Sequence, residues 1–314
     1  MRCGILFFVG VRHPHLFYIL TFKQEDIMKI STEIGSAARI VGEERAVELV
    51  ARAGFDAFDF SMFAMAPYDY QSRTLRPTDH PLHGDGYAAF AKRLATIAHE
   101  NGIVCNQSHA PFPVYCPEIR DYLKRAIECT AIAGADVCVI HPDNYKSAQE
   151  NAELFRELLP FAKAHGVRIA TENMWLWDNE RDCASAAACS HHDDFKAHID
   201  VVGDPFLVAC LDIGHAEMRG LDTSACDMIR TLGPRLQALH IHDNDRKYDS
   251  HRLPFTMDIA FGPIVEALRE IGYTGYLTLE ADRHLDGVQA EDVAKEICVM
   301  ADAARRLAAM FDAP

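Results

Sequence analysis

Acidic and imidazole side chains recur in this chain at points where a short apolar run stops. A single histidine or glutamate at such a point is usually a cap or a surface residue. Repeated burial of unpaired carboxylates at one place, however, is costly unless a cation offsets their charge. The repetition therefore predicts a metal-binding site. The residues at these points are His109, His141, Glu172, Asp212, His240 with His242, and Glu280.

The spacing inside two of these motifs also suits metal chemistry. In LDIGHAE, Asp212 ends an apolar run and His215 follows three residues later, so both side chains can face one opening. In LHIHDND, His240 and His242 are two residues apart, and the period of a β-strand turns both to the same side. Mixed carboxylate and imidazole ligands suit Zn²⁺, Mn²⁺, Co²⁺ or Fe²⁺ better than Ca²⁺ or a thiolate-selecting ion.

The elements that must position these side chains follow a regular alternation. Short β-rich runs bounded by turn residues alternate with segments whose apolar positions recur three and four residues apart. Eight such units without a linker predict one α/β domain, a single (β/α)8 TIM barrel that gathers its strand carboxyl ends at one mouth. The predicted strands are residues 28–34, 55–60, 103–109, 136–141, 167–173, 206–212, 236–242 and 275–280, and the predicted helices are residues 43–54, 87–102, 118–134, 151–166, 261–272 and 288–310.

The pattern assigns the barrel domain to residues 28–314 and leaves residues 1–27 as an N-terminal extension that we expect to be poorly ordered. Its two apolar runs are separated by Arg12, His13, Pro14 and His15, so neither is long enough to span a bilayer, and no cleavage site of a secretory signal follows. Ten scattered cysteines without a CxxC pair are typical of buried thiols in a reducing compartment. We therefore expect a cytoplasmic protein with no membrane partner.

Composition and missing motifs disfavour several other functions. Lys and Arg total 31 against 46 Asp and Glu, and the net charge of -15 disfavours nucleic acid as a partner. The dinucleotide fingerprint GxGxxG and the phosphate loop GxxxxGK[ST] are absent from the sequence. The usual sequence evidence for a nicotinamide-dependent or nucleoside triphosphate-dependent enzyme is therefore missing.

Two long loops follow predicted strands at residues 61–86 and 175–194. They carry Arg73, Arg76, Trp175, Trp177 and Arg181. Either loop could therefore form a lid over a polar or anionic substrate, or have no direct role in function. We expect the three histidines that follow, His191, His192 and His198, to be solvated.

Four motifs in order, TENMW, LDIGH, ALHIHDND and YLTLE, resemble the xylose-isomerase-like barrels from about Met28 to the C-terminus. That family includes sugar and sugar-phosphate isomerases and epimerases, inosose dehydratase and endonuclease IV. The resemblance implies Glu172, Asp212, His240 and Glu280 as metal ligands, with His215 beside them for the substrate. His242 stands where relatives have Lys or Asn, which leaves its role open between a second ligand and a substrate contact.

The resemblance extends to further histidines and an aspartate. SHAPF supplies His109, VIHPDN supplies His141, and DSHRLP supplies Asp249 and His251, which completes a set similar to the nine ligands of the trinuclear zinc site of endonuclease IV. The implied cofactor is thus a divalent metal, Zn²⁺, Mn²⁺ or Co²⁺, with one ion expected and room for up to three. One departure is PFTMDI at residues 254–259, where relatives have P-G-x-G-x-I, and it leaves the path of that loop open.

The implied function is a metal-dependent sugar or sugar-phosphate isomerase or epimerase that works through a metal-stabilised enediolate. Glu172 and Glu280 would move the proton, His215 would hold a hydroxyl, and Arg246 and Trp175 would contact the substrate. Three alternatives stay open: a multi-zinc phosphodiesterase of the endonuclease IV type, a metal-dependent lyase or dehydratase acting on a sugar or inosose, and a barrel without catalysis that serves as a binding subunit. The substrate, the metal and the oligomeric state, including a homo-oligomer, are not determined by the sequence.

Overall fold

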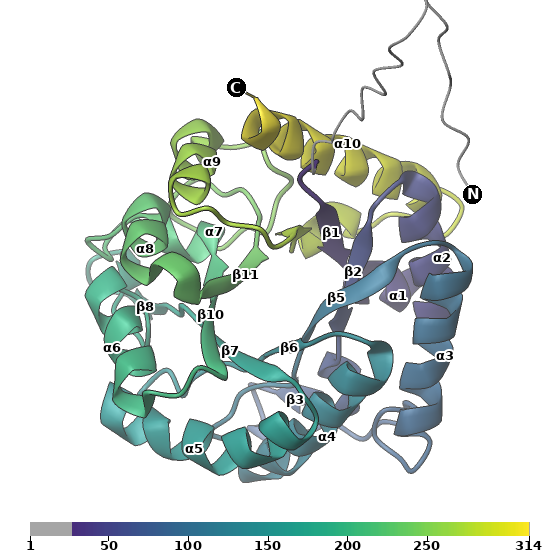
Figure 1. The fold of residues 1–314 in the computed structure, drawn as a ribbon, viewed down its shortest axis with the longest axis horizontal. Coiled ribbons are helices and arrows are strands. Elements are labelled where there is room, and N and C mark those ends of the chain that lie inside the picture. The colour runs from purple at the N-terminus through teal and green to yellow at the C-terminus, as the bar shows by residue number, and fades with distance from the viewer. Residues whose placement is uncertain (1–26, 314) are drawn as a thin grey trace, which may run out of the picture.

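The computed structural model describes residues 27–313, so the predicted N-terminal extension, apart from Ile27, lies outside the described part. Eight parallel strands form a barrel surrounded by helices (Figure 1), which confirms the predicted TIM barrel. Each strand overlaps one predicted run. The strands are β1 (Ile30–Glu33), β2 (Ala57–Ser61), β5 (Val104–His109), β6 (Val137–Val139), β7 (Arg168–Glu172), β10 (Leu207–Asp212), β11 (Leu236–His240) and β12 (Leu277–Leu279).

The barrel is closed between its last two strands. Strands neighbouring in sequence are neighbours in the sheet, whose order is β11-β10-β7-β6-β5-β2-β1-β12. A parallel bridge between Ile241 and Leu279 joins the two ends, with Ile241 N donating to Thr278 O at 2.9 Å and Glu280 N donating to Ile241 O at 3.0 Å. Closure therefore brings the LHIHDND segment against Glu280.

The helices cover the outside of the barrel and pack their apolar faces on it. The six predicted helices are present as α2, α3, α4, α5, α9 and α10, and α1, α6, α7 and α8 are additional. The α-helices are α1 (Gly35–Val41), α2 (Glu43–Ala53), α3 (Tyr87–Glu100), α4 (Pro117–Ala133), α5 (Ala148–Ala164), α6 (His192–Val202), α7 (Ile213–Ala216), α8 (Ala225–Leu232), α9 (Phe261–Glu270) and α10 (Val293–Asp312).

The expectation that His198 is solvated is wrong. His198 lies on the inner face of α6 and is 1% exposed. Its Nδ1 lies 2.9 Å from Asp194 O, and its Nε2 lies 3.3 Å from the Asn151 amide of α5. Because the residues around His198 are mostly polar, the sequence did not indicate this helix, which packs on the core through Phe195 and Ile199.

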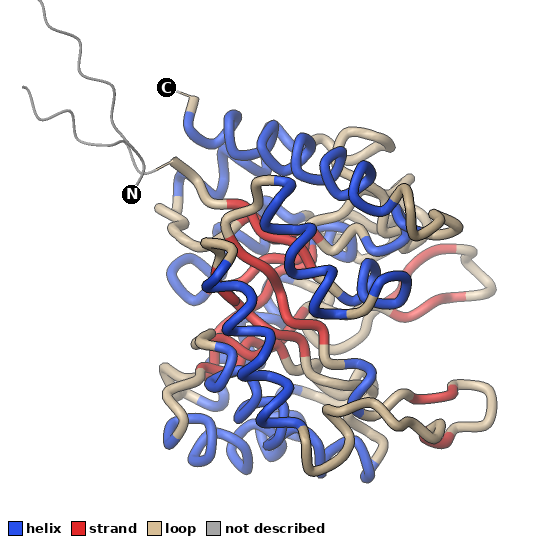
Figure 2. The backbone as a smooth tube through the Cα atoms, turned by 90° about the vertical axis from the view of Figure 1, so that its right-hand side faces the viewer, coloured by secondary structure: helices blue, strands red, loops and turns tan. Residues whose placement is uncertain are grey.

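The two long loops contain more regular structure than predicted. Each includes a small antiparallel hairpin, β3 (Tyr68–Asp69) with β4 (Thr74–Leu75), and β8 (Leu176–Asp178) with β9 (Cys183–Ser185). Figure 2 shows both hairpins projecting from the same side of the barrel. Trp177 of the second hairpin stacks on Tyr248, with ring centroids 5.5 Å apart. Between residues 27 and 313, no helix has the length and apolar content needed to cross a membrane.

Candidate metal centre

The predicted site residues meet at the carboxyl ends of the strands. His109, Glu172, Asp212 and His240 are the last residues of β5, β7, β10 and β11, and Glu280 directly follows β12. Because all eight strands are parallel, these ends share one mouth. The side chains divide into two adjoining clusters there.

The first group, which we call the glutamate cluster, surrounds Glu172 and Glu280. His240 Nδ1 lies 3.0 Å from Glu172 Oε1 and 3.4 Å from Glu280 Oε2, so one imidazole nitrogen faces both carboxylates. His141 Nε2 lies 3.1 Å from Glu172 Oε2, and His109 Nδ1 lies 3.3 Å from Glu280 Oε1. His109 and His141 in turn approach each other at 2.8 Å between their Nε2 atoms.

The second group, the aspartate cluster, surrounds Asp212 and Asp249. His242 Nε2 lies 3.2 Å from Asp212 Oδ1 and 3.4 Å from Asp249 Oδ1. His215 Nε2 lies 3.4 Å from Asp249 Oδ2, and His251 Nε2 lies 3.2 Å from Asp249 Oδ1. The rings of His242 and His251 are stacked, with centroids 4.0 Å apart. His251 Nδ1 is 2.8 Å from the backbone carbonyl of Glu280, which connects the two clusters.

The four predicted metal ligands are divided between the two clusters. Glu172 and Glu280 both contact His240, whereas the imidazole contacts of Asp212 are with His242 and His215. The cause is the backbone path after β10, where Asp212 Oδ1 accepts a hydrogen bond of 2.7 Å from His215 N and caps the short helix α7. Asp212 is thereby oriented toward the imidazoles of its own cluster.

Burial and neighbouring charges shift the pKa values of these groups in opposite directions. Burial would raise the pKa of Glu172, but His240 and His141 hold it well below its ordinary value. Burial raises the pKa of Glu280 well above its ordinary value. The neighbouring His240 opposes this rise in pKa, and the negative charge of Glu172 adds to it. Burial would lower the pKa of His215, yet Asp212 and Asp249 raise it to about 10. The mouth therefore concentrates groups that strongly influence one another's ionisation.

The donor set fits a divalent cation. Ligand atoms of His109, His141 and Glu172 lie within 4.8 Å of one another, as do those of the four residues His215, His242, Asp249 and His251. Several buried side-chain atoms in these clusters make no hydrogen bond of suitable geometry among residues 27–313, although some lie in ion-pair contact, and leaving such atoms without a hydrogen bond costs about 1–3 kcal/mol each. These atoms are His109 Nδ1, Glu172 Oε2, Asp212 Oδ2, His242 Nε2 and Asp249 Oδ1.

Local sequence explains how LDIGH builds its part of the mouth. A Cβ atom at Gly214 would overlap the His242 ring, so only glycine leaves room for that imidazole. Asn173, the residue after β7, donates from its amide to Asp212 O at 2.9 Å and accepts from Asp212 N at 2.8 Å. Its own carbonyl lies 2.9 Å from His215 Nδ1. The TEN and LDIGH motifs are thus joined by hydrogen bonds.

A residue that our sequence analysis missed, Asp243, determines the path of the PFTMDI loop. Its fully buried carboxylate accepts hydrogen bonds from the backbone N–H groups of Thr256, Met257 and Ile259 at 2.9–3.1 Å. Phe255 takes a positive φ of 71° in this turn. Asp243 lies within the ALHIHDND motif, and its position directly after His242 was the available signal.

A cavity of about 320 Å³ opens above both clusters. Trp175 lines it and lies edge-on to His215 at 6.4 Å between ring centroids. Phe63, Phe112 and Arg283 also line it, and none of them was predicted as a site residue. Arg246, which we expected to contact the substrate, is absent from the lining and pairs instead with Glu217 at 3.4 Å.

The family model described as "Xylose isomerase-like TIM barrel" matches residues 47–303, most of the chain. The chain belongs to this family. Among its sequence relatives are the uncharacterized protein MJ1311 of Methanocaldococcus jannaschii, 28% identical over 60% of this chain and 68% of that protein, and y4fM of Sinorhizobium fredii, 27% identical over 78% and 83%.

Several solved structures share the fold of this xylose isomerase-like barrel. A D-tagatose 3-epimerase-like protein superposes with a TM-score of 0.65 and 17% identity, covering 89% of this chain and 98% of the other. The IolI protein with a bound zinc atom gives 0.67 and 15%, covering 91% and 100%. The 3-keto-D-glucoside 4-epimerase YcjR of E. coli gives 0.61 and 16%, covering 89% and 98%. At these identities the likeness shows the fold.

Proposed function

We propose that this protein is a divalent-metal-dependent sugar isomerase or epimerase that transfers a proton at a carbon next to a carbonyl group. The observation that carries the proposal is the pair of buried carboxylates, Glu172 and Glu280, which approach His240 Nδ1 from two different strands at 3.0 and 3.4 Å. Two carboxylates on different sides of one cavity suit removal of a proton from one face of a carbon and its return to another.

We assign the metal cofactor to the same residues, because their donor atoms suit a divalent cation. Glu172, His240 and Glu280, with Asp212 from the neighbouring cluster, would hold the cation. A bound divalent cation would polarise adjacent carbonyl and hydroxyl oxygens of a sugar and so acidify the proton on the hydroxyl-bearing carbon next to the carbonyl. Histidine and carboxylate ligands suit Zn²⁺, Mn²⁺ or Co²⁺.

The other residues of the cavity would bind and orient the sugar. In our proposal Glu172 takes the proton from carbon, Glu280 returns one, and His215 donates a hydrogen bond to a hydroxyl. Trp175 provides an apolar wall. Phe63 lies edge-on to His109 at 4.8 Å and Phe112 stacks on His141 at 4.7 Å, so both keep water from one side of the glutamate cluster.

The comparisons support the substrate class. The similar structures include a D-psicose 3-epimerase in the presence of D-fructose, an L-ribulose 3-epimerase and a 3-keto-D-glucoside 4-epimerase. Each name describes inversion of configuration at one carbon of a sugar. The zinc atom of IolI lies in a barrel of the same fold. Ketoses, inososes and their phosphates are therefore the substrates to test first.

The test is an isotope experiment with metal-reloaded protein. Protein stripped by a chelator and reloaded with Mn²⁺, Co²⁺ or Zn²⁺ is incubated with each sugar in deuterated water. We expect an isomer or epimer that carries deuterium at one carbon. Glu280→Gln should abolish it, whereas the control Glu270→Gln, in a surface ion pair with Arg230 at 2.7 Å, should not. Unchanged turnover by E280Q would remove Glu280 from its assigned role.

The aspartate cluster favours a second candidate function. Its four residues His215, His242, Asp249 and His251 could hold an additional cation, and paired cations commonly activate water against a phosphodiester. Elemental analysis would separate the two functions, with about one metal per chain for a simple isomerase and two or three for a hydrolase of the endonuclease IV kind. Cleavage of DNA with an abasic site, without sugar isomerisation, would overturn the first proposal.

A further inference from the structure

Below the metal centre, a buried carboxylate contacts the one imidazole that both glutamates share. Asp59 lies on β2, is fully buried, and has its Oδ2 3.2 Å from His240 Nε2. Its register partner on β5 is Gln107, while Ser61 pairs with His109 at the mouth, so Asp59 lies one inward-facing position deeper than the glutamate cluster. The FDAFDF run reads as an ordinary strand, and our sequence analysis assigned Asp59 no role.

We propose that Asp59, supported by Gln107, positions His240 for the cation. Asp59 accepts a hydrogen bond from the Nε2–H of His240, which leaves Nδ1 as the coordinating nitrogen, facing Glu172 and Glu280. This inference rests on the proposed metal centre and adds a residue to it. Asp59 touches neither the substrate nor the cation, so it is a positioning residue.

The electrostatic environment of Asp59 supports this role. Among residues 27–313, no lysine or arginine lies within ion-pair distance of Asp59, and His240 is its only nitrogen partner of that kind. Burying a carboxylate is costly unless hydrogen-bond donors stabilise its charge, and the donors that face Asp59 Oδ2 are His240 Nε2–H and the Gln107 amide. Carboxylates that accept from the free N–H of a metal-bound histidine fix its ring orientation and tautomer.

A local irregularity of the sheet aims the supporting amide. The register between β2 and β5 shifts between Phe58 and Asp59, whose partners are Cys105 and Gln107, so Asn106 is an extra residue in β5. Such a bulge redirects side chains. Gln107 Nε2 then donates to Asp59 Oδ2 at 2.9 Å, and its Oε1 accepts from Asn106 Nδ2 at 3.2 Å and from Thr278 Oγ1 at 3.3 Å.

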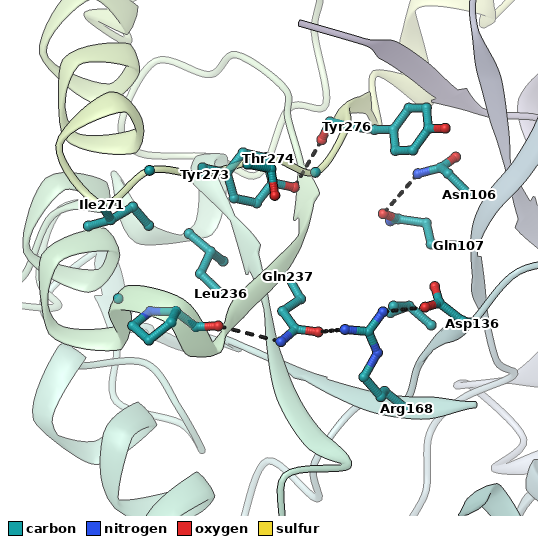
Figure 3. A pocket seen from close by; sticks show the side chains of 15 residues that line it. Asn106, Gln107, Asp136, Arg168, Leu236, Gln237, Ile271, Tyr273, Thr274 and Tyr276 are labelled. Carbon is teal, nitrogen blue, oxygen red and sulfur yellow. Dashed lines mark hydrogen bonds and ion pairs between the residues drawn. The ribbon is translucent and has the colours of Figure 1, made fainter. Parts of the chain in front are cut away.

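These bonds form a polar column from the amino-end floor of the barrel to its mouth. Figure 3 shows its lower end, where Asn106 and Gln107 are joined by a hydrogen bond at the edge of a floor cavity of about 390 Å³. Asn106 also accepts from Ser31 Oγ at 2.6 Å. The column prevents Gln107 from turning its amide over, because its oxygen would then face the Asp59 carboxylate.

The test measures metal affinity rather than turnover. Chelator-stripped wild-type protein, Asp59→Asn, Gln107→Leu and the control Thr171→Val are titrated with Co²⁺ against a chromophoric chelator, and the visible spectrum of bound Co²⁺ is recorded. Thr171 is as fully buried as Asp59, precedes Glu172, and its hydroxyl has no hydrogen-bond partner in the described chain. We expect D59N to bind Co²⁺ about 10- to 100-fold more weakly and to shift its spectrum, Q107L to weaken binding less, and T171V to match wild type.

Two outcomes would overturn the inference. Wild-type affinity and spectrum in folded D59N would show that His240 needs no such partner. If D59N does not fold, the Q107L variant tests the inference instead, because it keeps Asp59 but removes the amide that orients it. Wild-type Co²⁺ affinity and spectrum in Q107L would then show that this support of Asp59 is not needed for metal binding. Absence of Co²⁺ binding by the wild-type chain would instead overturn the proposed metal centre itself.

Discussion

The two ends of the barrel both carry polar side chains, but they pair them differently. At the amino-end floor, the guanidinium of Arg168 bridges the Gln237 amide and the Asp136 carboxylate, and Tyr273 donates to Tyr276 O at 3.1 Å (Figure 3). At the carboxyl-end mouth, buried atoms such as Glu172 Oε2 and Asp212 Oδ2 lack a hydrogen-bond partner in the described residues. Unpaired groups reduce stability, so the mouth is arranged for a ligand and the floor for the fold.

This contrast predicts opposite consequences of mutation at the two ends. Removing a mouth carboxylate should cost activity far more than stability, because one oxygen of Glu172 and one of Asp212 make no hydrogen bond in the described residues, so the fold uses these groups only in part. Removing a floor side chain should cost stability and leave activity intact. Enzymes commonly retain such poorly paired groups at their active sites at a cost in stability.

The largest effect is expected for Glu172→Gln. Its carboxylate approaches His240, at 3.0 Å, and His141, at 3.1 Å, and in our proposal it both binds the cation and moves the proton. Loss of a general base alone lowers a rate by about 10²–10⁴-fold, so we expect kcat to fall at least that far. Steady-state kinetics on the best substrate of the sugar panel checks this. The control Glu157→Gln, whose side chain is exposed on α5, should keep the wild-type kcat. A comparable loss of kcat in this control would show that the effect of E172Q is not specific to the mouth.

The next effect is steric and concerns Gly214→Ala. The new methyl group would overlap the His242 ring in the aspartate cluster. Overpacking of this kind costs about 1–3 kcal/mol, because His242 or the α7 turn must move. Urea unfolding of the chelator-treated protein measures the cost. Gly262→Ala on α9 is the matched control, since a Cβ there meets no atom within 4 Å, and equal midpoints for the two variants would show that His242 has room to move.

The sequence predicted the fold well because its signals are local. Each strand reads as an apolar run, and each polar side chain at a strand end could be placed at the mouth once the strands were parallel. His109, Glu172, His240 and Glu280 meet there for this reason. Five residues beyond the strand ends also reach the mouth, namely His141, His215, His242, Asp249 and His251.

What the sequence did not reveal depends on register and on packing between distant elements. Asp59 reads as one polar residue in an alternating strand, and its contact with His240 arises only when β2 and β11 face each other across the barrel. The bulge at Asn106 has no sequence signature of its own. The contact of Asp212 with His242, and the burial of His198 on the inner face of α6, likewise follow from backbone paths that composition does not record.

The smallest effect is expected at the floor, for Arg168→Met. Its guanidinium hydrogen-bonds Gln237 and Asp136, but the side chain is 31% exposed and Asp136 is 64% exposed, so water replaces part of what is lost. The aliphatic stem of methionine keeps the packing of the arginine stem. We expect a loss of about 1 kcal/mol in the free energy of unfolding and a kcat within about twofold of wild type. Urea unfolding and steady-state kinetics measure both quantities on one preparation. A marked loss of activity in R168M without a loss of stability would show that the floor communicates with the mouth, and it would end the functional separation of the two ends.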